Sequence, residues 1–220
     1  MFEVYNEQIF DMLDNNVKVY DQRNPNPSHA LEVRQARNGS VYIDKLSEYG
    51  VKNTTEVSTL LHMGGNKREE GHMDDSFDHN SRSHLLICIK IQRTNPSSKQ
   101  VTSGMIYIVD LAGSERTNLV AASGQRLREV QFVNKSLSAL SDVISGLSNH
   151  QKMIPYRSSK LTHCLQDCLK ANASRVLMFI NIHPLPMFKT ESVHSLEFGV
   201  KCKAVQLGPT KRHIAYGDTS

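Results

Sequence analysis

The sequence has 220 residues, a length that suits one domain with a substantial hydrophobic core, or two small domains. Its composition is typical of a soluble globular protein, with 39% hydrophobic and 22% charged residues. No run approaches the roughly 20 consecutive apolar residues of a membrane span, and a net charge of +4 favours an acidic partner only weakly.

The cysteines and histidines do not predict a metal site. The four cysteines form no CxxC pair, and the ten histidines show no HExxH or similar spacing. Free thiols in a reducing compartment, the cytosol or the nucleus, are the expected state. The amino-terminal residues also lack the charged leader and apolar core of a secretory signal.

The first part of the chain predicts short strands, loops and one helix. Phe2 to Tyr5 predicts a strand, and Ile9 to Leu13 a short helical turn. Residues 15–29 are rich in Asn, Pro and Asp and predict a loop. An Asn38-Gly39 turn between two alternating segments, 31–34 and 41–43, predicts a hairpin.

The middle of the chain predicts one helix and two strongly apolar strands. Thr55 to Met63 indicates a helix, and the polar segment 64–80 indicates a mobile connection. The strands cover Ser83 to Arg93 and Met105 to Leu111. The almost unbroken apolar run in the second strand is typical of a central strand that is covered on both faces.

The last part predicts three helices and one more buried strand. Apolar residues recur at three and four positions from Gln125 to Leu147, which indicates a long amphipathic helix. Further helices are expected around 161–169 and over Thr190 to Val205, with a buried strand at Arg175 to Ile182. The interleaving of strands and helices predicts an α/β layered domain, followed by a polar tail over 208–220.

The segment Asp110 to Glu115 directly follows the most apolar strand. An acidic residue at a strand end, followed by a glycine, is how many nucleotide hydrolases hold magnesium and sense the terminal phosphate. Asp110 would bind magnesium through water, and the backbone N–H of Gly113 would bind the γ-phosphate. Taken alone, such a segment is more often a plain junction between a strand and a loop.

The segment Asn80 to His84 precedes the neighbouring strand and offers a second set of polar groups. A hydroxyl here could bind magnesium or orient an attacking water, and Arg82 could pair with Glu115. Such a pair would couple the two loops. Taken alone, a loop rich in serine and arginine is more often simply solvated.

Together these segments resemble the motor domain of kinesins. Arg82-Ser83-His84 resembles the end of the kinesin switch I, and Asp110 to Glu115 (DLAGSE) resembles switch II. Asn134 to Leu140 resembles the relay helix of the family. Further similar segments are Glu3 to Glu7, Pro155 to Arg157, Ser159 to Thr162, Leu165 to Asp167 and Ser195 to Phe198. The likeness covers about residues 2 to 207 in the order of the family.

The resemblance implies a fold and a set of roles. The fold would be α/β, a three-layer sheet flanked by helices of the P-loop NTPase-like kinesin type. Ser81 would contact magnesium and the attacking water, and Arg82 and Glu115 would form the salt bridge that closes the pocket. Asn80, Ser83 and Asp110 would contact the nucleotide and its magnesium, with Ser81 and Asp110 as the metal ligands. Asn134 would pass the nucleotide state to the relay helix.

The resemblance also implies a microtubule partner. Tubulin is acidic, so its contact face on a motor should carry exposed cations whose binding is sensitive to salt. The residues at the corresponding positions are Arg116, Lys135, Tyr156, Arg157 and Lys160, with His163, Lys201 and Lys203 as helpers. Each one singly could be part of a solvated helix face. The expected location is the cytoplasm and its microtubule cytoskeleton, the spindle included, with no nucleic acid or membrane partner.

The sequence departs from the kinesin pattern in two places. No GxxxxGK[ST] phosphate-binding loop occurs in it, although kinesins carry one upstream of the strand with which this sequence begins. In switch I, Phe77 stands where the family has an asparagine, and Asn80 replaces a serine. We therefore expect the 220 residues alone not to hydrolyse ATP, although ATP and magnesium would be bound by a complete domain.

Two hypotheses follow. In the first, residues 1–207 are the carboxyl-terminal two-thirds of a working motor domain, most similar to the kinesin-14 class with its carboxyl-terminal motors. In the second, the chain is a non-catalytic kinesin homology module that grips microtubules or pairs with another motor chain through a coiled coil. In both, a family strand between the strands at 105–111 and 175–182 is missing, which predicts two unpaired edges and low stability.

Overall fold

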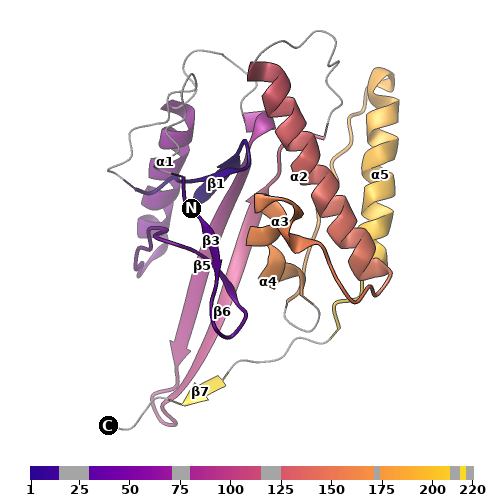
Figure 1. Cartoon of the computed structure of the whole chain (residues 1–220). Coiled ribbons are helices and arrows are strands. Elements are labelled where there is room, and N and C mark those ends of the chain that lie inside the picture. The colour runs from indigo at the N-terminus through magenta and orange to yellow at the C-terminus, as the bar shows by residue number, and fades with distance from the viewer. Residues whose placement is uncertain (15–29, 71–79, 115–124, 171–173, 209–213, 217–220) are drawn as a thin grey trace.

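The computed structural model describes residues 1–14, 30–70, 80–114, 125–170, 174–208 and 214–216. Five antiparallel strands form one sheet in the order β2-β1-β5-β6-β7, and two more form a small separate sheet, β3-β4. Helix α1 lies on one side of the large sheet, and α2, α3, α4 and α5 lie on the other (Figure 1). The predicted three-layer α/β architecture is confirmed.

The chain begins with a tight hairpin of β1 (Phe2–Tyr5) and β2 (Gln8–Asp11). Asn6 and Glu7 connect the strands, with φ angles of 50° and 60°. Two successive residues with positive φ are typical of a two-residue hairpin turn. The helical turn predicted at Ile9 to Leu13 is therefore wrong, because β2 continues to Asp11 and has side chains buried on both faces.

A long hairpin of β5 (His84–Thr94) and β6 (Gln100–Asp110) forms the centre of the sheet. Its side chains alternate between two cores. Leu86 packs with Phe2 and Val4 against α2 and α3. Leu85 and Ile87 lie on the other face, against residues of α1 (Thr54–Glu70). This alternation is the period of two that a sheet with helices on both faces requires.

The hairpin predicted around Asn38-Gly39 is confirmed as β3 (Val33–Gln35) and β4 (Val41–Ile43). Gly39 has a φ of 81°, which accounts for a glycine in this turn. The backbone N–H of Val41 donates to Asp167 at 2.6 Å, so the small sheet is tied to the helices of the main core.

The carboxyl-terminal helices lie close to their predicted positions. The long helix is α2 (Gln125–Ser148), and the last one is α5 (Lys189–Ala204). The helix predicted around 161–169 is two short helices, α3 (Lys160–Cys164) and α4 (Gln166–Leu169). The break falls at Leu165, whose φ of −85° and ψ of 0° leave the helical region. Three single 3-10 turns complete the description: η2 (Asn80–Arg82), η3 (Tyr156–Ser158) and η4 (Pro186–Phe188).

Helix α1 extends further than predicted, through the first part of the polar segment 64–80, and ends at Glu70. Two side chains near its end bind the rest of the protein. Lys67 donates to the backbone carbonyls of Asp11 and Asp14, and Arg68 enters the core. None of the described helices combines the length and apolarity that crossing a membrane would need.

Several apolar segments predicted to be buried are exposed. On β6, Met105, Ile106 and Ile108 are 50%, 48% and 54% exposed, so the strand is not covered on both faces. Residues 175–182 form no strand, and Leu177 and Phe179 are 77% and 78% exposed. Val193, Leu196 and Val200 on α5 are also exposed, whereas Phe198 and Cys202 of that helix reach the core.

These exposed segments share a physical cause. Among the described residues, β6 has β5 along one edge, and on the other edge only β7 (Ile214–Tyr216), which pairs with Gln100 to Thr102. The residues of β6 from Ser103 onward therefore have no neighbour on that side within the described ranges. This is the edge that was predicted to be unpaired. Strand β7 lies within the segment 208–220, which was predicted to be only a polar tail.

A buried ion pair joins α1 to the sheet. The guanidinium of Arg68 lies 3.0 Å from a carboxylate oxygen of Glu3 on β1, and the two side chains are 8% and 0% exposed. Arg68 also donates to the hydroxyl of Ser83, at 3.0 Å, and this hydroxyl donates to Glu3 at 2.5 Å. The charges are thus paired and hydrogen-bonded, as buried charges must be.

We expect Arg68→Met to lower the free energy of unfolding by about 3–5 kcal/mol, because it leaves the Glu3 carboxylate buried without its cation. Lys90→Met is the matched control. It removes a cation from an exposed pair with Glu48, and we expect a change below about 1 kcal/mol. Urea denaturation of the two variants measures both changes, and equal losses would contradict the role of the buried pair.

Candidate functional site

The two loops predicted to sense a nucleotide lie side by side. Strands β5 and β6 pair with Leu85 opposite Asp110, so the residues before β5 and those after β6 meet at one edge of the sheet. The backbone N–H of Gly113 donates to the backbone carbonyl of Ser81 at 2.7 Å. The structure therefore brings together the predicted switch I and switch II segments through a direct contact.

Arg82 is held by a carboxylate that the sequence did not single out. Its Nη1 lies 2.9 Å from Oε2 of Glu129 on α2, and the two side chains are 10% and 7% exposed. The hydroxyl of Tyr5 donates to the other carboxylate oxygen of Glu129 at 2.6 Å. The predicted partner of Arg82, Glu115, lies outside the described residues, as does Arg116.

The other predicted nucleotide contacts differ in their surroundings. Asn80 is the first residue of η2, and its side chain lies outside the part of the protein that the structure describes. The hydroxyl of Ser83 is fully buried between Glu3 and Arg68, so it faces the sheet interior. The carboxylate of Asp110 is 70% exposed, 3.6 Å from Nη1 of Arg68. For all three residues, contact with a nucleotide stays a prediction.

The donor set of this edge fits a magnesium ion that is bound together with phosphates. Magnesium prefers oxygen ligands, and it usually takes only one or two carboxylates plus substrate phosphate and water. The exposed carboxylate of Asp110 and the hydroxyl of Ser81 are ligands of this kind. Within the described ranges, no three His, Cys, Asp or Glu side chains gather as a metal site. A site formed by these residues would therefore depend on the phosphates.

His84 links three elements and was noted in the sequence only as part of a motif. The backbone N–H of Ala112 donates to its Nδ1 at 2.8 Å, and its Nε2 lies 2.7 Å from the hydroxyl of Ser136 on α2. The ring is 3% exposed. Burial, and secondly the charge of Arg68, lowers the pKa of His84 to about 4, so the imidazole is neutral near pH 7.

The predicted relay residue, Asn134, has an exposed side chain on α2. Ser136, two positions further on, is buried and makes the contact with His84. A signal for Ser136 was present in the sequence, because it lies three positions after Val133 and four before Leu140, within the apolar stripe of the helix. A polar residue at a buried helical position needs a hydrogen-bond partner.

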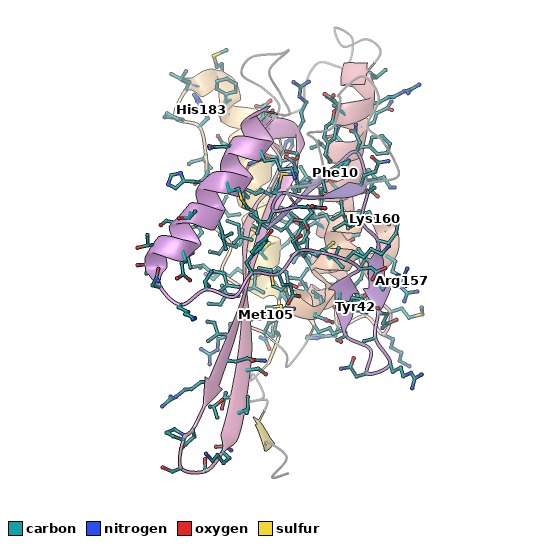
Figure 2. The ribbon with its side chains drawn as sticks, turned by 90° about the vertical axis from the view of Figure 1, so that its left-hand side faces the viewer. Phe10, Tyr42, Met105, Arg157, Lys160 and His183 are labelled. Atoms are coloured by element: carbon teal, nitrogen blue, oxygen red, sulfur yellow. The ribbon has the colours of Figure 1, made fainter. Side chains whose placement is uncertain are left out.

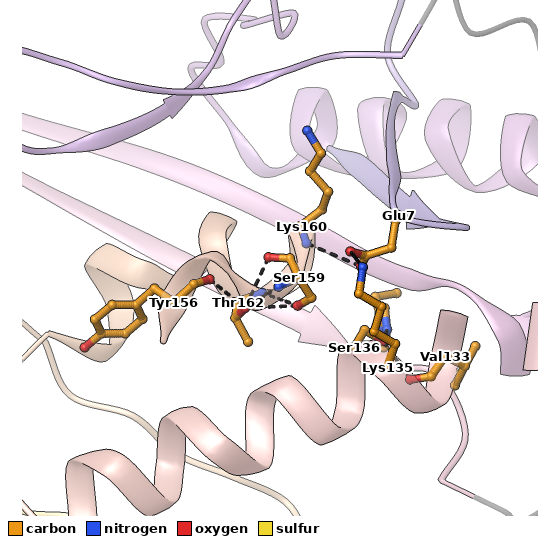
Figure 3. A network of polar contacts seen from close by, with 9 residues as sticks. Glu7, Val133, Lys135, Ser136, Tyr156, Ser159, Lys160 and Thr162 are labelled. Atoms are coloured by element: carbon orange, nitrogen blue, oxygen red, sulfur yellow. Dashed lines mark hydrogen bonds and ion pairs between the residues drawn. The ribbon is translucent and has the colours of Figure 1, made fainter. Parts of the chain in front are cut away.

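Two lysines of the predicted microtubule face contact the same acidic residue (Figure 3). Lys135 lies 3.0 Å from Oε2 of Glu7, at the tip of the β1–β2 hairpin. The backbone N–H of Lys160 donates to Oε1 of Glu7 at 3.3 Å, and the Lys160 ammonium pairs with Glu32. Glu7 thereby joins α2 to the start of α3. The side chain of Lys135 remains 54% exposed, and that of Lys160 28%.

The remaining predicted cations lie on η3, α3 and α5. Arg157 is exposed and donates to Gln35, and Figure 2 shows it on the same edge of the molecule as Lys160 and Tyr42. Tyr156 is half-buried and packs against the main core, so part of its role is structural. Burial, and then Arg157 and Lys160, lowers the pKa of His163. Lys201 and Lys203 are exposed in the last turn of α5.

The polar contacts of α3 fix the position of the predicted microtubule face around Arg157 and Lys160. Ser159 caps the helix by accepting from the backbone N–H of Thr162 at 3.1 Å, and the Thr162 hydroxyl donates to the carbonyl of Tyr156 at 2.7 Å. Figure 3 shows these residues beside Glu7 and Lys135. The sequence Tyr156 to Thr162 thus folds into one rigid unit that holds Arg157 and Lys160 in place.

Comparisons with known proteins identify the relatives of the chain. The family model described as "Kinesin motor domain" matches residues 1–205. Kinesin-like protein KIN-14E of Oryza sativa subsp. japonica is 40% identical over 97% of this chain, and KIN-14R of Arabidopsis thaliana is 39% identical over 99%. The chain spans about a fifth of the length of these curated relatives, 19% of each.

The solved structures agree with the curated relatives. The structure of a fast kinesin is 33% identical, with a TM-score of 0.80, and the match covers 99% of this chain and 58% of that one. The C-terminal motor and motor homology domain of Kar3Vik1 gives 33% identity and a TM-score of 0.74, over 91% of this chain and 49% of the other.

We expect the stability of wild type relative to His84→Asn to depend on pH. Because the folded-state pKa of about 4 lies below the ordinary value of 6.5, the unfolded chain takes up this proton first as the pH falls. The histidine therefore lowers the free energy of unfolding progressively from pH 6.5 to 4, and asparagine does not. Urea denaturation across this range should show the gap between the two proteins narrowing toward low pH. A widening gap would mean that His84 is charged in the folded protein.

Proposed function

The chain belongs to the kinesin motor-domain family, and we propose that it supplies the switch loops and the track-binding face of a microtubule-dependent ATPase motor. The observation that best supports this function is the hydrogen bond from Gly113 to the carbonyl of Ser81. It joins the loop that would sense the terminal phosphate to the loop that would orient the attacking water. Two loops that respond to one phosphate need such a direct contact in order to move together.

The chain's own residues would do three things in hydrolysis. The hydroxyl of Ser81 would orient water, and the N–H of Gly113 would turn from Ser81 toward the γ-phosphate. Arg82 would help to close the site, and its ion pair with Glu129 limits the rotation of its guanidinium. When bound with ATP, magnesium would neutralise charge on the phosphates. Ser81 and Asp110 are the residues that would hold it.

The 220 residues lack the glycine-rich loop that cradles the phosphates, so hydrolysis would need a segment that provides one. The exposed edge of β6 and the unpaired residues 175–182 support the same conclusion from the fold, because an additional strand could pair with both. In the proposed motor, the missing part would supply the strand and the phosphate-binding loop together.

The track-binding face would consist of Lys135, Arg157 and Lys160 on adjoining elements, with Lys201 and Lys203 on α5. Exposed lysine and arginine side chains attract an acidic polymer such as tubulin, and salt weakens the attraction. Glu7 and Glu32 neutralise part of this charge, so binding to the track would exchange internal ion pairs for external ones. The microtubule cytoskeleton, including the spindle, is the proposed location.

A second candidate function is a non-catalytic homology module that pairs with a motor chain. The changes at Phe77 and Asn80 in switch I favour it, and one of the similar structures contains a motor homology domain beside a motor. The presence of Arg82 and Glu115 in the sequence and the contact between Gly113 and Ser81 favour the catalytic reading. A measurement of hydrolysis separates the two candidates.

We expect the 220 residues alone to hydrolyse no ATP, because no loop holds the β- and γ-phosphates. We define the completed motor as a fusion protein with two parts. The first part is the segment of the KIN-14E motor domain that precedes the matched region, and the second part is this chain. The completed motor should hydrolyse ATP, and microtubules should stimulate it. A coupled phosphate-release assay measures both proteins. A completed motor that binds microtubules without hydrolysis would favour the homology module.

We expect Arg157→Ala and Lys160→Ala to weaken microtubule binding of the completed motor, by up to about fivefold each. The loss should shrink as salt is raised, because the contacts are between exposed charges. Co-sedimentation with microtubules measures the affinity. Lys52→Ala is the matched control, since it removes one exposed lysine ahead of α1. An equal loss in this control would mean that net charge alone is responsible.

A further inference from the structure

The imidazole of His84 connects the phosphate-sensing loop with the relay helix. His84 is the first residue of β5, paired with Val4 of β1, so its backbone is fixed in the sheet. Its two ring nitrogens contact Ala112, directly before Gly113, and Ser136, near the middle of α2. One buried side chain thus contacts both elements whose relative movement the proposed motor would depend on.

The chemistry of the contacts allows only one arrangement of protons. The backbone N–H of Ala112 can only donate, so Nδ1 of His84 must carry a lone pair. The proton of the neutral ring is therefore on Nε2, which donates to the hydroxyl oxygen of Ser136 at 2.7 Å. The Ser136 hydroxyl in turn donates to the carbonyl of Val133 at 2.8 Å. Figure 3 shows Ser136 and Val133 at this end of the chain of hydrogen bonds.

This chain of hydrogen bonds has a fixed direction, from Ala112 through His84 and Ser136 to Val133. It cannot be reversed, because it starts at a backbone N–H and ends at a backbone carbonyl. Its members are buried, so a broken bond would leave an unsatisfied polar group instead of one bound to water. A displacement of Ala112 is therefore opposed by α2, and a displacement of α2 by Ala112.

We propose that His84 is a positioning residue that couples the backbone of the Gly113 loop to the relay helix α2. When Gly113 turns from Ser81 toward a phosphate, the bond to His84 holds the adjoining Ala112 in register with Ser136. The nucleotide state then changes the position of α2 and, with it, of Lys135 on the track-binding face. This inference rests on the proposed motor function.

Two substitutions separate the halves of the bridge. Asparagine can place an acceptor near the position of Nδ1, so His84→Asn keeps the bond to Ala112 and loses the bond to Ser136. Glutamine can place a donor near the position of Nε2, so His84→Gln does the opposite. Ser136→Ala removes the α2 end. The same two changes at His62, which is exposed on α1, are the matched controls.

The experiment measures ATP hydrolysis by the completed motor with and without microtubules, and compares the ratio of the two rates. We expect each His84 variant and Ser136→Ala to lower this ratio about three- to tenfold, and the His62 variants to leave it unchanged. A variant that is merely less stable lowers both rates by one factor and leaves the ratio intact. An unchanged ratio in all three variants, with an active wild type, would overturn the proposal for His84.

Combining the variants gives a second test. Ser136→Ala should have no further effect on this ratio in either the His84→Asn or the His84→Gln protein, because each of these substitutions already breaks the series of hydrogen bonds. A further loss in either background as large as that of Ser136→Ala alone would overturn the proposal. Nitrogen NMR of the histidine rings should also find the proton of His84 on Nε2, and a proton on Nδ1 would contradict the bridge. A wild-type motor without hydrolysis would instead overturn the proposed function.

Discussion

The buried charge of Arg68 is the constraint on which the arrangement of the site depends. Its guanidinium contacts Glu3 on β1, Ser83 directly before β5 and Asp110 at the end of β6. Separating a buried arginine from its partners strongly destabilises the folded protein. These segments therefore keep their relative positions. The two candidate switch segments start from this fixed point, since η2 ends one residue before Ser83 and Gly113 follows Asp110 by three.

The sequence predicted the fold wherever the periodicity of the residues had only one structural solution. The apolar stripe of α2 and the turn at Gly39 are examples. The prediction was wrong where an apolar run had several solutions. Ile9 to Leu13 could form a helical turn or a strand. The tight turn at Asn6 and Glu7 pairs this segment with β1, and it is therefore a strand as far as Asp11. Residues 175–182 have the composition of a strand, but a strand needs a neighbour, and composition does not provide one.

For the candidate site, the motifs identified the loops but not the side chains that hold them. The loops that carry Ser81 and Gly113 were expected to be coupled, and a backbone hydrogen bond joins them. Glu129 and Ser136 were not expected, because each is one polar residue within an amphipathic helix and its partner is distant in sequence. Tyr5 and Glu129 are 124 residues apart. Periodicity shows that such a residue is buried, and burial implies a partner, but only the folded chain identifies which partner it is.

The open edge of β6 has a consequence for the life of the chain in a cell. A protein is made from its amino terminus, so in a complete motor the upstream strand already exists when β6 leaves the ribosome and can cover it at once. Without such a strand, half-exposed Met105, Ile106 and Ile108 lie beside backbone groups that have no strand partner within the described ranges. Chaperones and proteases act on such surfaces. Quality control would therefore act on any chain in which this edge stays uncovered.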